Sequence, residues 1–261
     1  MPYLQVNGAK IYYEVSGSGP AVVFTHGHSM NHKQWHPQIE ALAENYQTIT
    51  WDVRGHGHST LPPGEVNPRD FSKDLNALLN HLQIRNAVLC GLSMGGHISI
   101  QTAAYYPEKV KGLILIGTPF TNRFNWFEKY GAPFSKLSLR ILPYSWTKEL
   151  TASILSKFNP SNKSYVRESF SQINKADFLR HWSGNLKMES THLLDHITCP
   201  TLILHGDQDK MVARQQSLLK SAIKGSEFKT ISNADHLTNL DNPTEVTEVI
   251  HSFLISHHSS D

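Results

Sequence analysis

One serine lies in a setting that favours nucleophilic chemistry. Ser93 stands in the run Gly91-Leu92-Ser93-Met94-Gly95-Gly96, where an apolar segment ends and a helix-like segment begins. A turn this sharp brings backbone atoms close together two residues before and two residues after the serine, where only glycine avoids a Cβ clash. It also exposes the hydroxyl at a helix N-terminus, which favours developing negative charge. We therefore expect Ser93 to be a catalytic nucleophile.

A serine hydroxyl is a weak nucleophile without a base, and the base is commonly a histidine supported by an acid. His236 follows the last predicted strand, in a loop where open α/β sheets place their sites, so we expect it to be the base. Two candidate acids lie in the preceding loop, His205-Gly206-Asp207-Gln208-Asp209. We prefer Asp209, which follows the turn and can point back toward His236. Asp207 is expected to cap or brace the loop.

An acyl-transfer site also needs backbone N–H groups that stabilise the oxyanion. One is expected from Met94, the residue after the nucleophile, and the other from the loop that follows an early strand. In that loop we prefer the amide of His28, with Ser29 as the second choice. Four side chains are candidates for a substrate pocket: Ser29, Trp126, Phe127 and Leu237.

Histidine is frequent in this chain, which has 16 of them, and two His-x-His pairs could in principle bind zinc. The pairs are His26-Gly27-His28 and His56-Gly57-His58. Neither is followed by the further cluster of ligands that would complete a site, so we interpret both as loop histidines. We expect no metal and no organic cofactor.

The composition excludes several functional classes. The 261 residues are 39% hydrophobic and 18% charged, with a net charge of +2, so nothing indicates nucleic-acid binding. No apolar run approaches the roughly 18 residues that would span a membrane, and the N-terminus lacks the features of a signal peptide. We expect a cytoplasmic protein with a small-molecule substrate. The oligomeric state stays open.

Short apolar segments alternate with helix-like stretches, a pattern that predicts a mostly parallel sheet covered by helices. The expected strands are 3–6, 10–16, 21–25, 46–52, 87–91, 110–117, 201–206 and 227–232. The expected helices include 94–106, about 211–222, and 243–255. The predicted fold is therefore an eight-stranded α/β sheet flanked by helices.

The alternation stops between about Pro119 and Leu194, where aromatic residues are frequent and no strand is evident. This stretch is far longer than an ordinary loop, so we expect several short helices there. The sequence thus predicts a core formed by residues 1–118 and 195–261, with a helical cap at 119–194.

Together these residues resemble the α/β-hydrolase fold superfamily. The likeness rests on His26-Gly27, the Asp52–Ser59 run, the Ser93 motif, the 205–209 loop and His236. In this family an aspartate in the position of Asp209 is the usual triad acid, and a helical cap roofs the pocket. The segment from His236 to Pro243 is similar to that of 3-oxoadipate enol-lactonases and related esterases.

The resemblance implies a serine hydrolase of the carboxylesterase or lactonase type with no cofactor. The aromatic residues between Pro119 and Leu194 indicate an apolar pocket and hence a small, hydrophobic substrate. Carbon–carbon bond hydrolases often have tryptophan after the histidine, where this chain has Leu237. Such a hydrolase, or a perhydrolase with the same triad, remains an alternative. A further alternative is not an enzyme but a ligand-binding receptor or regulator with the same fold.

Overall fold

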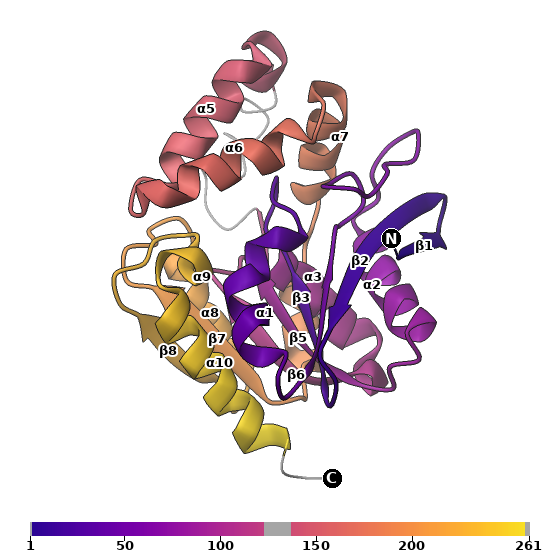
Figure 1. Ribbon diagram of the computed structural model, residues 1–261, viewed down its shortest axis with the longest axis vertical. Coiled ribbons are helices and arrows are strands. Elements are labelled where there is room, and N and C mark those ends of the chain that lie inside the picture. The colour runs from indigo at the N-terminus through magenta and orange to yellow at the C-terminus, as the bar shows by residue number, and fades with distance from the viewer. Residues whose placement is uncertain (1, 123–136, 259–261) are drawn as a thin grey trace.

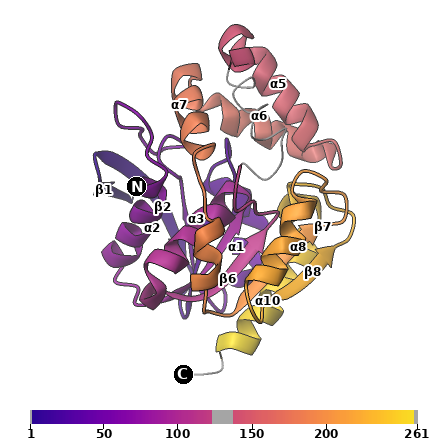
Figure 2. The same cartoon turned by 180° about the vertical axis from the view of Figure 1, so that it is seen from behind.

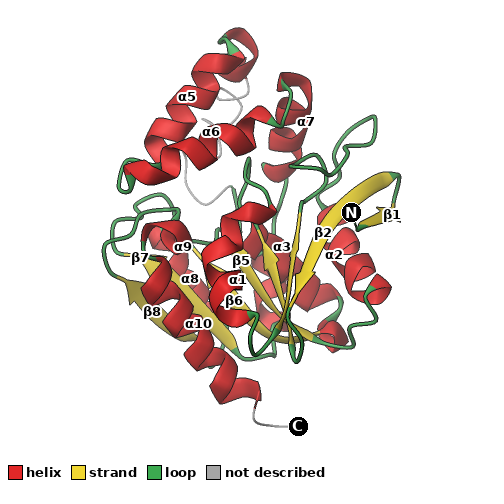
Figure 3. Ribbon diagram, in the orientation of Figure 1, coloured by secondary structure: helices red, strands yellow, loops and turns green. Residues whose placement is uncertain are grey.

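The computed structural model describes residues 2–122 and 137–258 of the chain. Within these residues eight strands form one sheet, in the order β1-β2-β4-β3-β5-β6-β7-β8. Six of the strands are parallel, and β1 and β2 are antiparallel at one edge (Figure 3). The predicted α/β fold with a mostly parallel sheet is confirmed. The strands are β1 Tyr3–Val6, β2 Ala9–Ser16, β3 Ala21–Thr25, β4 Gln47–Trp51, β5 Ala87–Leu92, β6 Val110–Ile116, β7 Thr201–Gly206 and β8 Glu227–Ile231.

Helices cover both faces of the sheet. α1 (His36–Leu42) and α10 (Pro243–His258) lie on the face toward the viewer in Figure 1. α2 (Arg69–His81), α3 (Met94–Tyr105) and α8 (Ala213–Ala222) lie on the opposite face, seen in Figure 2. Short 3₁₀ helices are labelled η, and α9 is a single helical turn. Their bounds are η1 His32–Trp35, η2 Pro107–Lys109, η3 Pro160–Asn162, η4 Thr191–His196 and α9 Thr238–Asp241.

The central strands are buried on both faces, which explains why they read as continuous apolar runs. Every residue of β3 and β5 is buried. Successive residues alternate between two cores: Val23 packs with the α2 and α3 side, whereas Val22 and Phe24 pack with the α1 and α10 side. This alternation is the period of two that a strand imposes on its side chains.

Between β6 and β7 the described residues form helices rather than strands of the sheet. α5 (Tyr144–Leu155), α6 (Lys163–Ser171) and α7 (Lys175–Asn185) lie together beyond one end of the sheet (Figure 1). The only strand-like pairing among the described residues of this region is an isolated bridge between Thr121 and Glu189. The division of the chain at 118/119 and 194/195 stays a prediction.

Two helices differ slightly from expectation. The helix expected from about Met211 begins at Ala213, because the Asp209 carboxylate accepts a hydrogen bond from the Met211 amide at 2.9 Å and holds that residue in a turn. The closing helix runs three residues further than predicted, to His258. Across the described ranges, no helix combines the length and apolar character needed to cross a bilayer.

Candidate active site

Ser93 stands alone between β5 and α3, in the strained turn that the sequence predicted. Its backbone angles are φ 53° and ψ −115°, in the left-handed half of conformational space that most residues avoid. A Cβ built on Gly95 would lie 2.1 Å from the carbonyl oxygen of Thr25, and one on Gly91 would lie 2.3 Å from the carbonyl carbon of Gly95. Both glycines are therefore required by close backbone contacts, as expected.

His236 lies in the loop between β8 and α9, and its ring connects two of the predicted site residues. Its Nε2 is 3.0 Å from Oγ of Ser93, and its Nδ1 is 2.8 Å from Oδ2 of Asp209. His236 and Asp209 are both buried. The structure thus brings together three residues from three separate loops, with spacings suited to hydrogen bonds.

The two candidate acids of the 205–209 loop make different contacts. Oδ2 of Asp209 faces the imidazole of His236, and Oδ1 of the same carboxylate accepts from the Met211 amide. Oδ1 of Asp207 accepts instead from the amide of Ala234 at 3.1 Å. Asp207 therefore braces the loop that carries His236 and does not contact its ring.

The electrostatics of the pair favour a charged Asp209 beside a basic His236. Burial lowers the pKa of His236, but the negative charge of Asp209 and its hydrogen bond outweigh this and raise the pKa above its usual value. Burial also raises the pKa of Asp209, but the opposing charge of His236 and the hydrogen bonds it accepts bring the pKa below its usual value. The arrangement can accept a proton on Nε2 and stabilise the resulting cation.

The two residues predicted to donate to the oxyanion, Met94 and His28, both line the same cavity as Ser93. Met94 opens α3, where the first amides of a helix have no intrahelical acceptor. The amide of His28 has no hydrogen-bond acceptor among the contacts of the described residues. Next to it, Ser29 is buried with φ 67°, so the loop turns sharply at this point.

A cavity of about 560 Å³ opens at these residues. Ser93, His236, His28, Ser29 and Leu237 all line it, so the structure places two of the four predicted pocket residues there. Trp126 and Phe127 lie outside the described residues.

Most of the cavity wall comes from residues that sequence reasoning did not single out. Many of these residues belong to the helical region between β6 and β7. The polar positions of the wall include Asn122 and, from α8, Gln215. The many aromatic residues in this part of the sequence indicated an apolar pocket, but the sequence did not show which of them face the cavity. The apolar lining residues between Leu139 and Leu186 are Leu139, Ile154, Leu155, Phe170, Phe178, Trp182 and Leu186.

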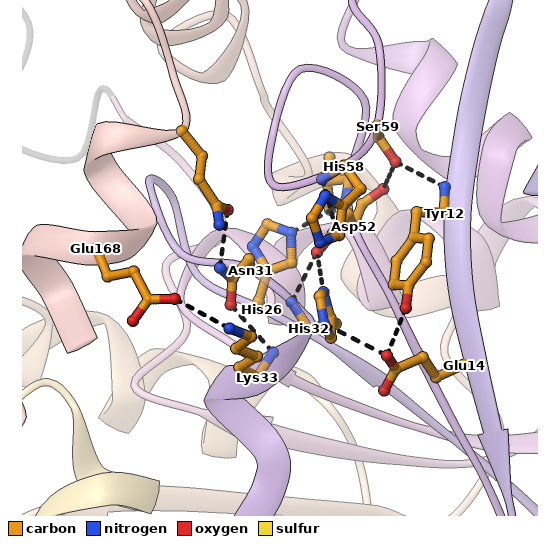
Figure 4. A network of polar contacts seen from close by, with 12 residues as sticks. Tyr12, Glu14, His26, Asn31, His32, Lys33, Asp52, His58, Ser59 and Glu168 are labelled. Carbon is orange, nitrogen blue, oxygen red and sulfur yellow. Dashed lines mark hydrogen bonds and ion pairs between the residues drawn. The ribbon is translucent and has the colours of Figure 1, made fainter. Parts of the chain in front are cut away.

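A buried polar network lies behind the loop that carries His28. Asp52 accepts hydrogen bonds from the amide of His32 at 2.7 Å, from Nδ1 of His32 at 2.9 Å and from the amide of His58 at 2.8 Å (Figure 4). The amide of Val53 donates to Nε2 of His26. These contacts join the loops after β3 and β4, so residues of the Asp52–Ser59 run brace the loop that carries His28.

The chain is similar to known proteins over nearly its whole length. A family model described as alpha/beta hydrolase fold matches residues 20–243. The 3-oxoadipate enol-lactonase 1 of Acinetobacter baylyi is 24% identical over 260 residues, which cover 97% of this chain and 92% of that protein. The non-heme chloroperoxidase CPO-A1 of Kitasatospora aureofaciens is 28% identical over 249 residues, 88% of this chain and 90% of that one.

Among solved structures, a thermophilic esterase from Thermogutta terrifontis matches with a TM-score of 0.88 and 27% identity. The match covers 98% of this chain and 97% of the esterase. The family model matches residues 20–243, which include the turn at Ser93 and the loops that carry Asp209 and His236. The chain therefore belongs to the α/β-hydrolase fold family.

Proposed function

We propose that this α/β hydrolase cleaves carboxylic esters or lactones through an acyl-enzyme formed on Ser93. One observation carries the proposal: the His236 ring lies within hydrogen-bond distance of Ser93 on one side and of Asp209 on the other. This is the geometry that activates a serine hydroxyl in acyl transfer.

In the first half of the reaction, Oγ of Ser93 attacks the substrate carbonyl while Nε2 of His236 takes the hydroxyl proton. Asp209 holds the imidazole through Nδ1 and stabilises its positive charge. His236 then returns the proton to the departing alcohol, which leaves an ester on Ser93. A positioned base of this kind contributes about 10²–10⁴ in rate.

The oxyanion that forms during the attack is bound by the amides of Met94 and His28. The positive end of α3 adds to this stabilisation, because Met94 is its first residue. Removal of one such donor costs about 10²–10³ in rate where it has been tested. In the second half of the reaction, His236 activates water, which attacks the acyl-enzyme and releases the acid.

The cavity supports a small and largely apolar substrate. Its wall is mostly aliphatic and aromatic, and its polar groups gather near Ser93 and at a few positions such as Asn122 and Gln215. A pocket of this kind fixes a substrate through shape, with a few polar contacts for orientation. We propose that residues 119–194 act as the cap that supplies this wall to the core of residues 1–118 and 195–261.

The experiment that tests the proposal compares substrates of different classes on the same enzyme. Initial rates are measured with p-nitrophenyl esters of increasing acyl length, with simple lactones, and with a vinylogous diketone. Turnover of short esters or lactones, lost in Ser93→Ala, is the expected result. Preference for the diketone would indicate carbon–carbon hydrolysis. A single slow turnover with retained ligand would indicate a receptor instead.

A second candidate reaction is perhydrolysis, favoured by the likeness to a non-heme chloroperoxidase. In this reaction hydrogen peroxide replaces water as the nucleophile that attacks the acyl-enzyme, and the product is a peracid. It uses the same Ser93, His236 and Asp209. Peracid formation from acetate and peroxide, measured beside ester hydrolysis, decides which reaction dominates.

A further inference from the structure

Three histidines from distant parts of the chain meet beside the cavity. His28 follows β3, His56 follows β4, and His181 lies on α7 in the helical region. The ring centroids are 5.5 Å apart for His28 and His56, 5.4 Å for His28 and His181, and 4.1 Å for His56 and His181. One ring nitrogen of each lies within 4.8 Å of those of the other two.

These nitrogens are buried but lack hydrogen-bond partners. Nε2 of His28, Nε2 of His56 and both ring nitrogens of His181 are inaccessible to solvent and make no hydrogen bond of acceptable distance and angle among the described residues, although the backbone of Arg54 lies near the His181 ring. The side chains of His56 and His181 are almost entirely enclosed, with 1% exposure each. Buried polar atoms normally have partners, so three groups that lack them at one point suggest a missing ligand.

The surroundings suit neutral imidazoles that present Nε2. Nδ1 of His56 faces the carbonyl oxygen of Arg54 at 3.3 Å, and Nδ1 of His28 lies 2.9 Å from Oγ of Ser29. A proton held on Nδ1 by an outer acceptor leaves the Nε2 lone pair free, as is usual for metal-binding histidines. Burial lowers the pKa of all three rings, to about 3 for His28.

We propose that His28, His56 and His181 bind one zinc ion, or a similar divalent transition metal. Three imidazoles are a known zinc donor set, and imidazole favours zinc, copper or nickel over magnesium and calcium. With Zn–N bonds of about 2.0–2.1 Å, tetrahedral ligand atoms lie about 3.4 Å apart, so shifts of roughly 1 Å would close the site. A fourth position remains for water.

The ion would connect the helical region to the loops of the core. His181 belongs to α7, while His28 belongs to the loop whose amide is the proposed oxyanion donor. Aromatic rings lie next to the three histidines. The ring centroids of Phe71 and His181 are 5.1 Å apart, and those of Trp182 and His28 are 5.0 Å apart. Zinc bound here would hold α7 against the loop that carries His28 and so fix the position of the α7 side chains that line the cavity.

The binding experiment uses the full chain after treatment with a chelator and dialysis. Zinc is titrated calorimetrically, and bound metal is counted by elemental analysis after gel filtration. One zinc per chain, with a higher melting temperature, is expected for the parent protein and equally for Ser93→Ala. Binding that is lost in His181→Phe and His56→Asn but kept in His192→Ala, an exposed control, supports the site.

Each ligand variant should bind zinc at least about 100-fold more weakly, since loss of an outer partner alone costs 10–100-fold. X-ray absorption of the zinc-loaded parent protein should show three imidazole nitrogens, which keeps the test decisive even where a variant fails to fold. No stoichiometric zinc in the parent protein, or unchanged affinity in both variants, would overturn the proposal. Neither readout depends on hydrolysis, so the proposed reaction can fail while the metal site stands.

Discussion

Oδ2 of Asp209 lies 2.8 Å from Nδ1 of His236, whereas Asp207, two residues earlier in the same loop, accepts a hydrogen bond from the amide of Ala234. The two carboxylates therefore support the same histidine in different ways. Asp209 contacts the ring and controls its charge and orientation. Asp207 fixes the backbone of the loop from which the ring projects.

This difference predicts unequal effects of the two Asp→Asn substitutions. Asp209→Asn should reduce kcat/KM by about 10⁴, because an amide facing Nδ1 favours the wrong imidazole tautomer and cannot stabilise the cation. Asp207→Asn keeps an oxygen that can accept a hydrogen bond from the Ala234 amide. It should therefore lower kcat/KM by less than about tenfold, far less than Asp209→Asn does. Steady-state kinetics with a p-nitrophenyl ester measure both. A larger loss in Asp207→Asn would transfer the role of the acid to that residue.

The pH dependence of the rate follows from the raised pKa of His236. Only the neutral ring can take the proton of Ser93, so kcat/KM should fall as the pH drops through the pKa of His236, with a midpoint above the ordinary histidine value of 6.5. A plot of kcat/KM against pH measures this midpoint, which is the pKa of His236 in the free enzyme.

The same profile in Asp209→Asn supplies the matched control. Loss of the carboxylate removes the charge and the hydrogen bond that raise the pKa of His236, while burial continues to lower it. The acid limb of the residual activity should therefore move to lower pH. An unchanged midpoint would show that a different group titrates, and that His236 is not the base.

The glycine after the serine turn predicts a steric effect on stability. In Gly95→Ala the new Cβ would lie 2.1 Å from the Thr25 oxygen, which belongs to the backbone of β3 and cannot give way. The free energy of unfolding should fall by about 3 kcal/mol or more, the upper range for overpacked sites. Chemical denaturation measures it, together with the loss of ester hydrolysis.

Gly112→Ala is the matched control for that substitution. Gly112 lies in β6, and a Cβ there would meet its nearest atoms at 3.4–3.5 Å, which is ordinary contact. Its free energy of unfolding should stay unchanged or rise by up to about 1 kcal/mol, because alanine loses less backbone entropy than glycine on folding. Equal losses in the two variants would mean that glycine matters here for reasons other than close backbone approach.

The sheet and the contacts that join Ser93, His236 and Asp209 were predictable from the sequence, because both leave local signals. The apolar runs of β3 and β5 predicted strands buried on both faces, and the glycines at 91 and 95 predicted the strained turn at Ser93. Chain order then pointed to His236, and the turn in the 205–209 loop separated Asp209 from Asp207.

Features that depend on long-range packing were not predictable in this way. Sequence reasoning interpreted His28 and His56 as loop histidines with no metal, because their third partner, His181, lies 125 residues beyond His56. The zinc proposal departs from that expectation. The lining of the cavity was not predictable either. Phe170, Phe178 and Trp182 are three of many aromatic residues in this region, and they line the cavity only because of how α6 and α7 pack.

The measurement that tests the central claim most directly is intact-protein and peptide mass spectrometry after reaction with a serine-directed fluorophosphonate. The parent protein should gain one label on Ser93 and lose ester hydrolysis in proportion, whereas Ser93→Ala should stay unlabelled, inactive and folded. A label on another residue, or ester hydrolysis retained in folded Ser93→Ala, would contradict the account.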